Sequence, residues 1–423
     1  MGFIRRSVGR IVNYLALDES LIGLLAASVI MSLAGSLWGS LLGLHITTGL
    51  GIPVLAFGLM GTVQQMVSSL TIFPSGFLSD NFGRKKMIMT STVFSILTLA
   101  TLFLVRDLPW LFLVSVFQGL GTSFLGPSIS AYIIDVAPQE RRGQAYATLA
   151  LFQSLSGIIG TSIAGSIADA FGFTCVFGIA LGLECVSLGV MMLYLKESLG
   201  GDSAGARTTR ESYFGQLKNG LVMLKNPALL AVLFGIVFHQ LGLGIQGPYV
   251  AIYASNVLVF SLPAISLMLG LQRLGIFLGH FPSGKIVDEY GGEIAFAFHI
   301  FVTSPAMVFF TVGGTPFLAG LDLFLWGLTF GLDNVSRQKL VAKYRSKSGT
   351  ATAFGVISLV AGVISLVTPT IGGWVWTSFS PQTVFYASAA TNVLGSLPLF
   401  MLWLRNRNMK AGVADQQDEL AIP

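Results

Sequence analysis

The segment Phe73-Pro-Ser-Gly-Phe-Leu-Ser-Asp-Asn-Phe-Gly83 returns 208 residues later as Phe281-Pro-Ser-Gly-Lys-Ile-Val-Asp-Glu-Tyr-Gly291. Neighbouring segments keep the same offset. Gln64-Gln65 aligns with Gln272-Arg273, and Gly160-Thr-Ser-Ile-Ala-Gly165 aligns with Thr368-Pro-Thr-Ile-Gly-Gly373. The repeat therefore indicates a chain made of two similar halves.

The composition places these halves in a membrane. Hydrophobic residues make up 53% of the 423 residues and charged residues only 10%, whereas soluble proteins carry about 25% charged residues. The 50 glycines allow helices to approach closely in lipid. The basic residues separate apolar segments and form no patch, so the net charge of +5 does not indicate nucleic-acid binding.

Twelve apolar segments are long enough to cross a bilayer, whose core requires about 20 helical residues. Six precede a polar stretch and six follow it. We therefore predict an all-α membrane protein with twelve transmembrane helices in two pseudo-symmetric six-helix bundles. The predicted spans are 21–44, 51–75, 87–105, 110–133, 145–168, 172–195, 228–256, 262–284, 294–312, 316–335, 350–375 and 382–404.

The positions of the basic residues predict the orientation. Of the 24 lysines and arginines, all but two fall on one side of the predicted membrane, while Arg106 lies on the opposite side and Arg273 within a span. Because basic loops stay in the cytoplasm, both termini are predicted to be cytoplasmic and the protein to lie in the cell membrane. The predicted parts are an interfacial helix (1–20), an N-terminal bundle (21–195), a cytoplasmic linker (196–227), a C-terminal bundle (228–404) and a cytoplasmic tail (405–423).

Two loop motifs carry a family resemblance. Gly76-Phe-Leu-Ser-Asp80-Asn-Phe-Gly83-Arg84-Lys85 lies between predicted helices 2 and 3, and Asp135-Val-Ala-Pro-Gln-Glu140-Arg-Arg142-Gly143 ends helix 4. With the repeat, they make the chain resemble the major facilitator superfamily, nearest to its twelve-helix drug and solute exporters. The resemblance implies two bundles that rock about a cavity lined by helices 2, 5, 8 and 11.

The first motif is expected to form a cytoplasmic gate. Gly76 and Gly83 would allow a tight turn between two closely packed helices. The resemblance implies that Asp80, braced by Arg84, meets the N-terminus of helix 11 near Gly349. By the pseudo-symmetry, Asp288 would meet the start of helix 5. The alternative is that the motif's charges only set topology, but this explains the basic residues and not the aspartates.

Two ionisable residues in the spans are candidates for the transport pathway, because charge at bilayer depth is costly. Arg273 lies near the middle of helix 8 and aligns with the neutral Gln65. It could clamp an anionic or carbonyl-bearing substrate, with Asp322 of helix 10 as counter-ion or proton carrier. The alternatives are a static ion pair or an arginine that reaches backbone carbonyls.

Neutral polar and aromatic residues extend this candidate pathway. His239 and Gln240 precede a glycine-rich run that ends at Pro248, where helix 7 is expected to break. A histidine that serves only packing is the alternative. Hydrogen-bonding and stacking candidates, each of which could instead serve packing, are Gln64, Gln65, Gln118, Gln272 and Trp326.

The four histidines fall on separate segments without the spacing of metal ligands, so we predict neither a metal site nor a cofactor. These residues are His45, His239, His280 and His299. No nucleophile, base and orienting group come together on nearby segments, and no Gly-x-x-x-x-Gly-Lys-Ser/Thr loop is present. The chain is therefore not expected to be an enzyme or an ATP-driven pump.

The leading interpretation is a secondary transporter that exports small amphipathic solutes, coupled to a proton or another ion. Ser115 stands where many drug/proton antiporters carry an arginine, and predicted helix 1 has no carboxylate, so the usual proton relay of those relatives is in doubt. Import or exchange of an organic anion through Arg273 is the first alternative. A transporter-like sensor or lipid-handling protein is the second. The expected partners are a small molecule, a coupling ion and the bilayer, with no nucleic acid and a monomeric chain.

Overall fold

The computed structural model describes residues 19–198, 225–344 and 350–420. Most of the predicted interfacial helix (1–20) and linker (196–227) lies outside these residues. Among the described residues, 12 helices are long and apolar enough to cross a membrane. The predicted all-α fold class is confirmed.

The chain divides into two compact units. Unit 1 is Met1–Thr208 with Pro248–Arg273, and unit 2 is Thr209–Gly247 with Leu274–Pro423. The turn η4 (Gly247–Tyr249) contains the boundary between the units, since its first residue belongs to unit 2 and the other two to unit 1. The helices that belong wholly to unit 1 are α2 (Glu19–Gly39), α3 (Leu42–Leu44), the π-helical turn η1 (His45–Gly49), α4 (Val54–Phe82), α5 (Arg84–Leu104), α6 (Leu108–Val136), η2 (Gln139–Arg141), α7 (Arg142–Phe171), α8 (Phe173–Tyr194) and α11 (Val250–Asn256).

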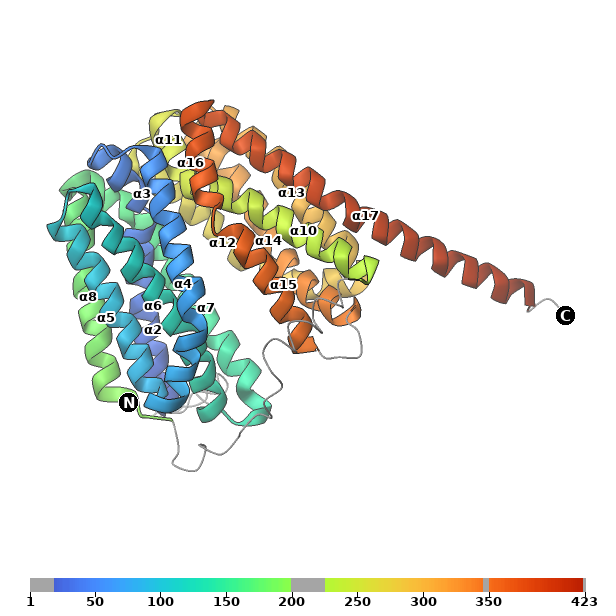
Figure 1. Ribbon diagram of the computed structural model, residues 1–423, viewed down its shortest axis with the longest axis horizontal. Helices are drawn as coiled ribbons and strands as arrows, with labels where there is room; N and C mark the ends of the chain where they lie inside the picture. Colours follow the sequence, from blue (N-terminus) through green and yellow to red (C-terminus); the bar gives the residue numbers. More distant parts are fainter. Residues whose placement is uncertain (1–18, 199–224, 345–349, 421–423) are drawn as a thin grey trace, which may run out of the picture. The chain divides into compact units, whose positions relative to one another are not determined.

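The helices of unit 1 lie side by side, with α2 against α7 and α8, and α6 against α4 and α5 (Figure 1). Glycines allow the backbones of these helices to approach each other closely. A methyl group placed on Gly119 of α6 would come within 2.6 Å of the Gln64 carbonyl oxygen, and one on Gly160 of α7 within 2.7 Å of the Leu33 carbonyl oxygen. Such backbone contacts suit lipid, where burial of apolar surface does not itself drive helices together.

Unit 2 is built around the contacts of α10 and α13 with α17, and of α13 with α14. Buried apolar side chains of these helices form its core, among them Leu233, Phe296, Ile300 and Leu399. The helices outside unit 1 are α10 (Pro227–Gln246), α13 (Gly292–Val312), α14 (Pro316–Tyr344), α15 (Thr350–Ser365), α16 (Thr368–Ser378) and α17 (Pro381–Leu420), while α12 (Leu262–Tyr290) is shared by the two units.

Two predicted helix spans can be compared with the structure. In predicted helix 7, α10 ends at Gln246, and the turn η4 then leads into α11. The expected break in the glycine-rich run is therefore confirmed. Predicted helix 11 (350–375) is divided into α15 and α16. Pro369 lies in the first turn of α16, where its missing N–H costs no hydrogen bond.

The repeated motif is more helical than expected. Helix α4 continues to Phe82 and α12 to Tyr290, so Gly83 and Gly291 alone separate each helix from the next. Both have positive φ angles, 107° and 94°. The prediction that Gly76 also shapes the turn was wrong: it lies inside α4, and a methyl group there would meet no described atom within 4 Å.

Candidate functional site

An arginine joins three carboxylates at the end of unit 1 that carries the repeated motif. Arg84 forms an ion pair with Asp80, and its Nε lies 3.2 Å from Asp135 Oδ2. Its backbone N–H donates to Glu197 Oε1 over 2.8 Å. Arg84 therefore braces Asp80, as expected, and also connects α4, α5 and α6. The expected partner of Asp80 near Gly349 lies outside the described residues.

Glu197 was missed by the sequence analysis. Its carboxylate accepts hydrogen bonds from the first two backbone N–H groups of α5, at Arg84 and Lys85. A carboxylate at a helix N-terminus is stabilised by the helix dipole. A methyl group on Gly83 would fall on this carboxylate, so Gly83 provides both the backbone angle and the space.

Replacement of Gly83 by alanine is expected to destabilise the protein by about 1–3 kcal/mol, because φ is positive there and Glu197 is displaced. Thermal unfolding of the purified protein measures the change. Gly182→Ala in α8 is the matched control, since a methyl group at Gly182 meets nothing within 4 Å and alanine favours helix. Equal melting temperatures of the two variants would contradict the assignment.

The equivalent end of unit 2 has its own ion pairs, and in one of them the signs are exchanged. Lys343 Nζ lies 2.5 Å from Glu293 Oε1, where Lys343 aligns with Asp135 and Glu293 with Lys85 at the offset of 208. Asp288 pairs with Lys339 over 2.7 Å. Gly292 replaces the motif's arginine, and a lysine of α14 supplies the positive charge instead.

Arg273 is exposed and belongs to unit 1. A methyl group on Gly157 of α7 would come within 3.2 Å of Arg273 Nη1 and 3.2 Å of the Ser36 hydroxyl oxygen of α2. Gly157 therefore leaves room for the guanidinium beside α2 and α7. Among the described residues, Arg273 has neither an ion pair nor a hydrogen bond. Asp322 belongs to unit 2, and their expected pairing stays a prediction.

The glutamine candidates of unit 1 are half-buried. Gln64 and Gln118 occur where α4 and α6 pack closely at Gly119. One turn further on, the Thr122 hydroxyl donates to Ser68 Oγ over 3.3 Å. Gln65 and Gln272 are also half-buried, on α4 and α12.

The far end of unit 1 contains close contacts between α7 and the first part of α12. A methyl group on Gly165 would overlap the Leu262 carbonyl oxygen, and one on Gly270 would overlap the Ser162 hydroxyl. Near this end, Thr48 of η1 donates to Asn256 Oδ1 over 3.2 Å. The first three turns of α12 thus pack directly on α7.

In unit 2, Asp322 is half-buried, and its Oδ2 has no hydrogen-bond partner among the described residues. Trp326, one turn further along α14, is 5% exposed. Its indole N–H donates to Thr303 Oγ1 over 2.9 Å, and its ring packs edge-on against Phe330. Gln240 is half-buried on α10.

Two of the four histidines lie close together in the structure although they fall on separate segments of the sequence. His239 of α10, His299 of α13 and Asp333 of α14 are each 0% exposed, and one potential ligand atom from each lies within 4.8 Å of the others. Sequence spacing missed this cluster because each residue comes from a different helix. The sequence did contain a local indication for Asp333, because Arg337 follows it by four residues, the spacing of an ion pair within a helix. The two residues form this ion pair in the structure.

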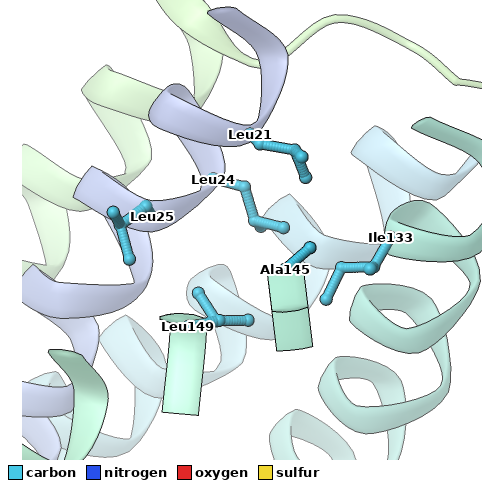
Figure 2. Close-up of a pocket in the computed structure, with 6 residues that line it drawn as sticks. All are labelled: Leu21, Leu24, Leu25, Ile133, Ala145 and Leu149. Atoms are coloured by element: carbon cyan, nitrogen blue, oxygen red, sulfur yellow. The ribbon is translucent and has the colours of Figure 1, made fainter. Parts of the chain in front are cut away.

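Two cavities are lined almost entirely by apolar side chains. A cavity of about 10 Å³ in unit 1 is lined by six apolar side chains, which surround it in Figure 2: Leu21, Leu24, Leu25, Ile133, Ala145 and Leu149. It has room for about one water molecule. A cavity of about 350 Å³ lies along α13 and α17, where the exposed Phe298, Phe301 and Phe400 form an apolar wall.

Comparison with known proteins identifies the family. The model of the Major Facilitator Superfamily matches residues 24–239 and 232–421. The two matches begin 208 residues apart, which equals the offset of the internal repeat. The chain therefore belongs to the Major Facilitator Superfamily, and it is a membrane transporter rather than an enzyme.

Relatives of similar length include efflux pumps. "Multi-drug resistance efflux pump PmrA" of Streptococcus pneumoniae serotype 4 is 24% identical over 81% of this chain and 85% of the relative. "Multidrug resistance protein MdtG" of Serratia proteamaculans is 23% identical over 78% and 80%. The crystal structure of the nucleoside transporter NupG has a TM-score of 0.74 at 14% identity, covering 92% of this chain and 99% of that one. This structural likeness shows the fold alone.

Proposed function

We propose that the protein is a secondary active transporter that exports a small amphipathic organic solute by alternating access. The observation that carries the proposal is the exposed guanidinium of Arg273 beside α2 and α7, which has no acidic partner among the described residues. A charged group near the middle of a membrane span requires a polar partner. A carbonyl or carboxylate group of the solute is the partner proposed here.

The direction of transport is inferred from the relatives. PmrA and MdtG bear names that describe them as a multidrug efflux pump and a multidrug resistance protein. We extend export to this chain on that similarity. Both termini are proposed to be cytoplasmic, since all but two of the lysines and arginines fall on one predicted side.

Replacement of Arg273 by glutamine tests the proposed contact, because the aligned residue of the other half is Gln65. A hydrogen bond to a charged group contributes about 1.5–3 kcal/mol. We therefore expect the affinity for the solute to fall by about tenfold to a hundredfold. The purified protein is screened against cationic, neutral and anionic amphipathic compounds by thermal shift, and the binders are then assayed for transport in proteoliposomes.

Arg106→Gln is the matched control, because Arg106 is an exposed arginine between α5 and α6. It should bind and transport like the native protein. If lipophilic cations stabilise both the native protein and Arg273→Gln equally, Arg273 makes no direct contact with the solute. If no compound is transported by the native protein in either direction, the transporter proposal itself fails.

Import or exchange of an organic anion is the second candidate. The guanidinium of Arg273, which has no acidic partner among the described residues, favours it as well. Export and import are separated by loading the anion on one side of oriented proteoliposomes. Transport of the anion toward the cytoplasmic face would favour the second candidate if this transport is lost in Arg273→Gln. Asp322, whose Oδ2 has no partner among the described residues, is the proposed proton carrier in either case.

A further inference from the structure

We propose that His239, His299 and Asp333 bind a divalent transition-metal ion of the zinc class inside unit 2. These three residues, called here the His-His-Asp cluster, are fully buried and come from α10, α13 and α14. The proposal is independent of the transported solute. It rests on the closeness of the three residues and on the hydrogens that their unpartnered atoms lack.

Neighbouring side chains determine where the hydrogen of His239 lies. His239 Nδ1 lies 2.6 Å from Asn392 Oδ1 of α17, and Asn392 Nδ2 donates to the Ser388 carbonyl oxygen over 2.7 Å. Because that carbonyl can only accept, the amide oxygen of Asn392 faces the histidine. His239 Nδ1 therefore carries the hydrogen, and Nε2 presents a lone pair.

The same reasoning applies to His299. Its Nδ1 lies 2.8 Å from Thr329 Oγ1, and the Thr329 hydroxyl donates its hydrogen to the Trp326 carbonyl oxygen over 2.8 Å. The hydroxyl oxygen must accept from His299, so Nδ1 again carries the hydrogen. His299 Nε2 presents a second lone pair.

The carboxylate of Asp333 supplies the third acceptor. Its Oδ2 forms the ion pair with Arg337, while Oδ1 has no hydrogen-bond partner among the described residues. His239 Nε2 and His299 Nε2 also lack partners in this part of the chain. The three residues, whose potential ligand atoms lie within 4.8 Å of one another, thus each carry a buried acceptor that receives no hydrogen from the described residues. Each unsatisfied polar group costs free energy.

A metal ion satisfies all three acceptors at once. One water molecule has two hydrogens and would leave one acceptor unpaired, and one proton would join only two of them. Imidazole nitrogen and carboxylate oxygen are ligands of zinc, at about 2.0–2.2 Å. Tetrahedral ligands at that distance lie about 3.4 Å apart, so the cluster, within 4.8 Å, needs only side-chain adjustments of about 1 Å.

The surroundings suit such an ion. Histidines that bind metal donate their other ring N–H to a neighbouring acceptor, as His239 does to Asn392 and His299 to Thr329. The positive charge of Arg337 opposes a cation, but the Arg337 side chain is 23% exposed and is partly solvated. Two nitrogen ligands disfavour calcium and magnesium, which prefer oxygen.

The test uses the full-length protein purified in detergent, stripped with a chelator and then titrated with Zn²⁺ or Co²⁺. We expect one Co²⁺ per chain, with the visible absorption of a nitrogen-ligated four-coordinate ion, and a rise of about 5 °C in melting temperature at saturating Zn²⁺. Both signals should be lost in His239→Gln and in His299→Gln. His280→Gln, which alters an exposed histidine of α12, should keep both.

Several outcomes would overturn the proposal. One is the absence of any Zn²⁺ effect on the native protein up to about 1 mM, a very weak affinity. Another is Co²⁺ absorption that persists in both cluster variants while they remain folded by size-exclusion chromatography. A third is a nitrogen-15 spectrum in which one imidazole of the cluster is doubly protonated near neutral pH and the protein takes up no metal. This result would mean that the cluster binds a proton instead of a metal ion.

Discussion

Transport is expected to fall at least tenfold when Gly165 is replaced by leucine. A methyl group at this position already overlaps the Leu262 carbonyl oxygen and the Ser266 hydroxyl, so a leucine forces α7 away from the first part of α12. Under the alternating access proposed above, we expect this contact to close one side of the pathway. A variant that cannot form the contact stays open on that side and completes no cycle.

Cysteine labelling measures this opening. Cys175 and Cys185 are first replaced by serine, and Ser266, which is fully buried, is replaced by cysteine. Labelling of this cysteine by a membrane-impermeant reagent should be faster when Gly165→Leu is added. Gly189→Leu in α8 is the control, since nothing lies within 4 Å of a methyl group there. Unchanged labelling and transport in Gly165→Leu would refute the gating role.

The second large effect is expected from Asp333→Asn. Asp333 is fully buried and forms an ion pair with Arg337. Loss of one charge leaves the other without its partner, which costs about 3–5 kcal/mol for a fully buried pair. Because Arg337 can reach solvent, we expect a loss of about 2–3 kcal/mol in the free energy of unfolding. Thermal unfolding with a chelator present excludes any contribution of bound metal.

Two further variants isolate the cause. Asp288→Asn also removes the acid of an ion pair, but the Asp288 side chain is 78% exposed, and such surface pairs contribute about 0–1 kcal/mol. Replacing Asp333 and Arg337 together by leucine should recover much of the loss, because no unpaired charge remains. If Asp333→Asn and Asp288→Asn unfold at the same temperature, the buried pair contributes no more to stability than the exposed one.

Much of the fold could be predicted from the sequence because lipid imposes simple requirements. Apolar length and the repeat at an offset of 208 predicted the twelve spans and the fold class. Helix ends were less predictable. Residues 76–82 are polar enough to suggest a loop, yet nothing in them breaks a helix, so α4 continues until the positive φ of Gly83.

The candidate site was only partly predictable. Arg273 stood out because charge in a span is rare, but its neighbours Ser36 and Gly157 carry no signal in a single sequence. His239 was identified, whereas His299 and Asp333 were not. Hydrophobic periodicity cannot show that three polar side chains on three different helices point to one place.

The aligned ion pairs of the two halves carry opposite charges on corresponding helices, and this limits which segments the halves could exchange. In unit 1 the acid Asp135 meets Arg84, and in unit 2 the base Lys343 meets Glu293. A recombination event that copied only the start of α5 into the other half would put Lys85 in place of Glu293, so that two cations would meet at Lys343. Such an exchange of a short segment would replace an attraction by a repulsion at this end of unit 2, whereas an exchange that included both partners would keep the pair intact.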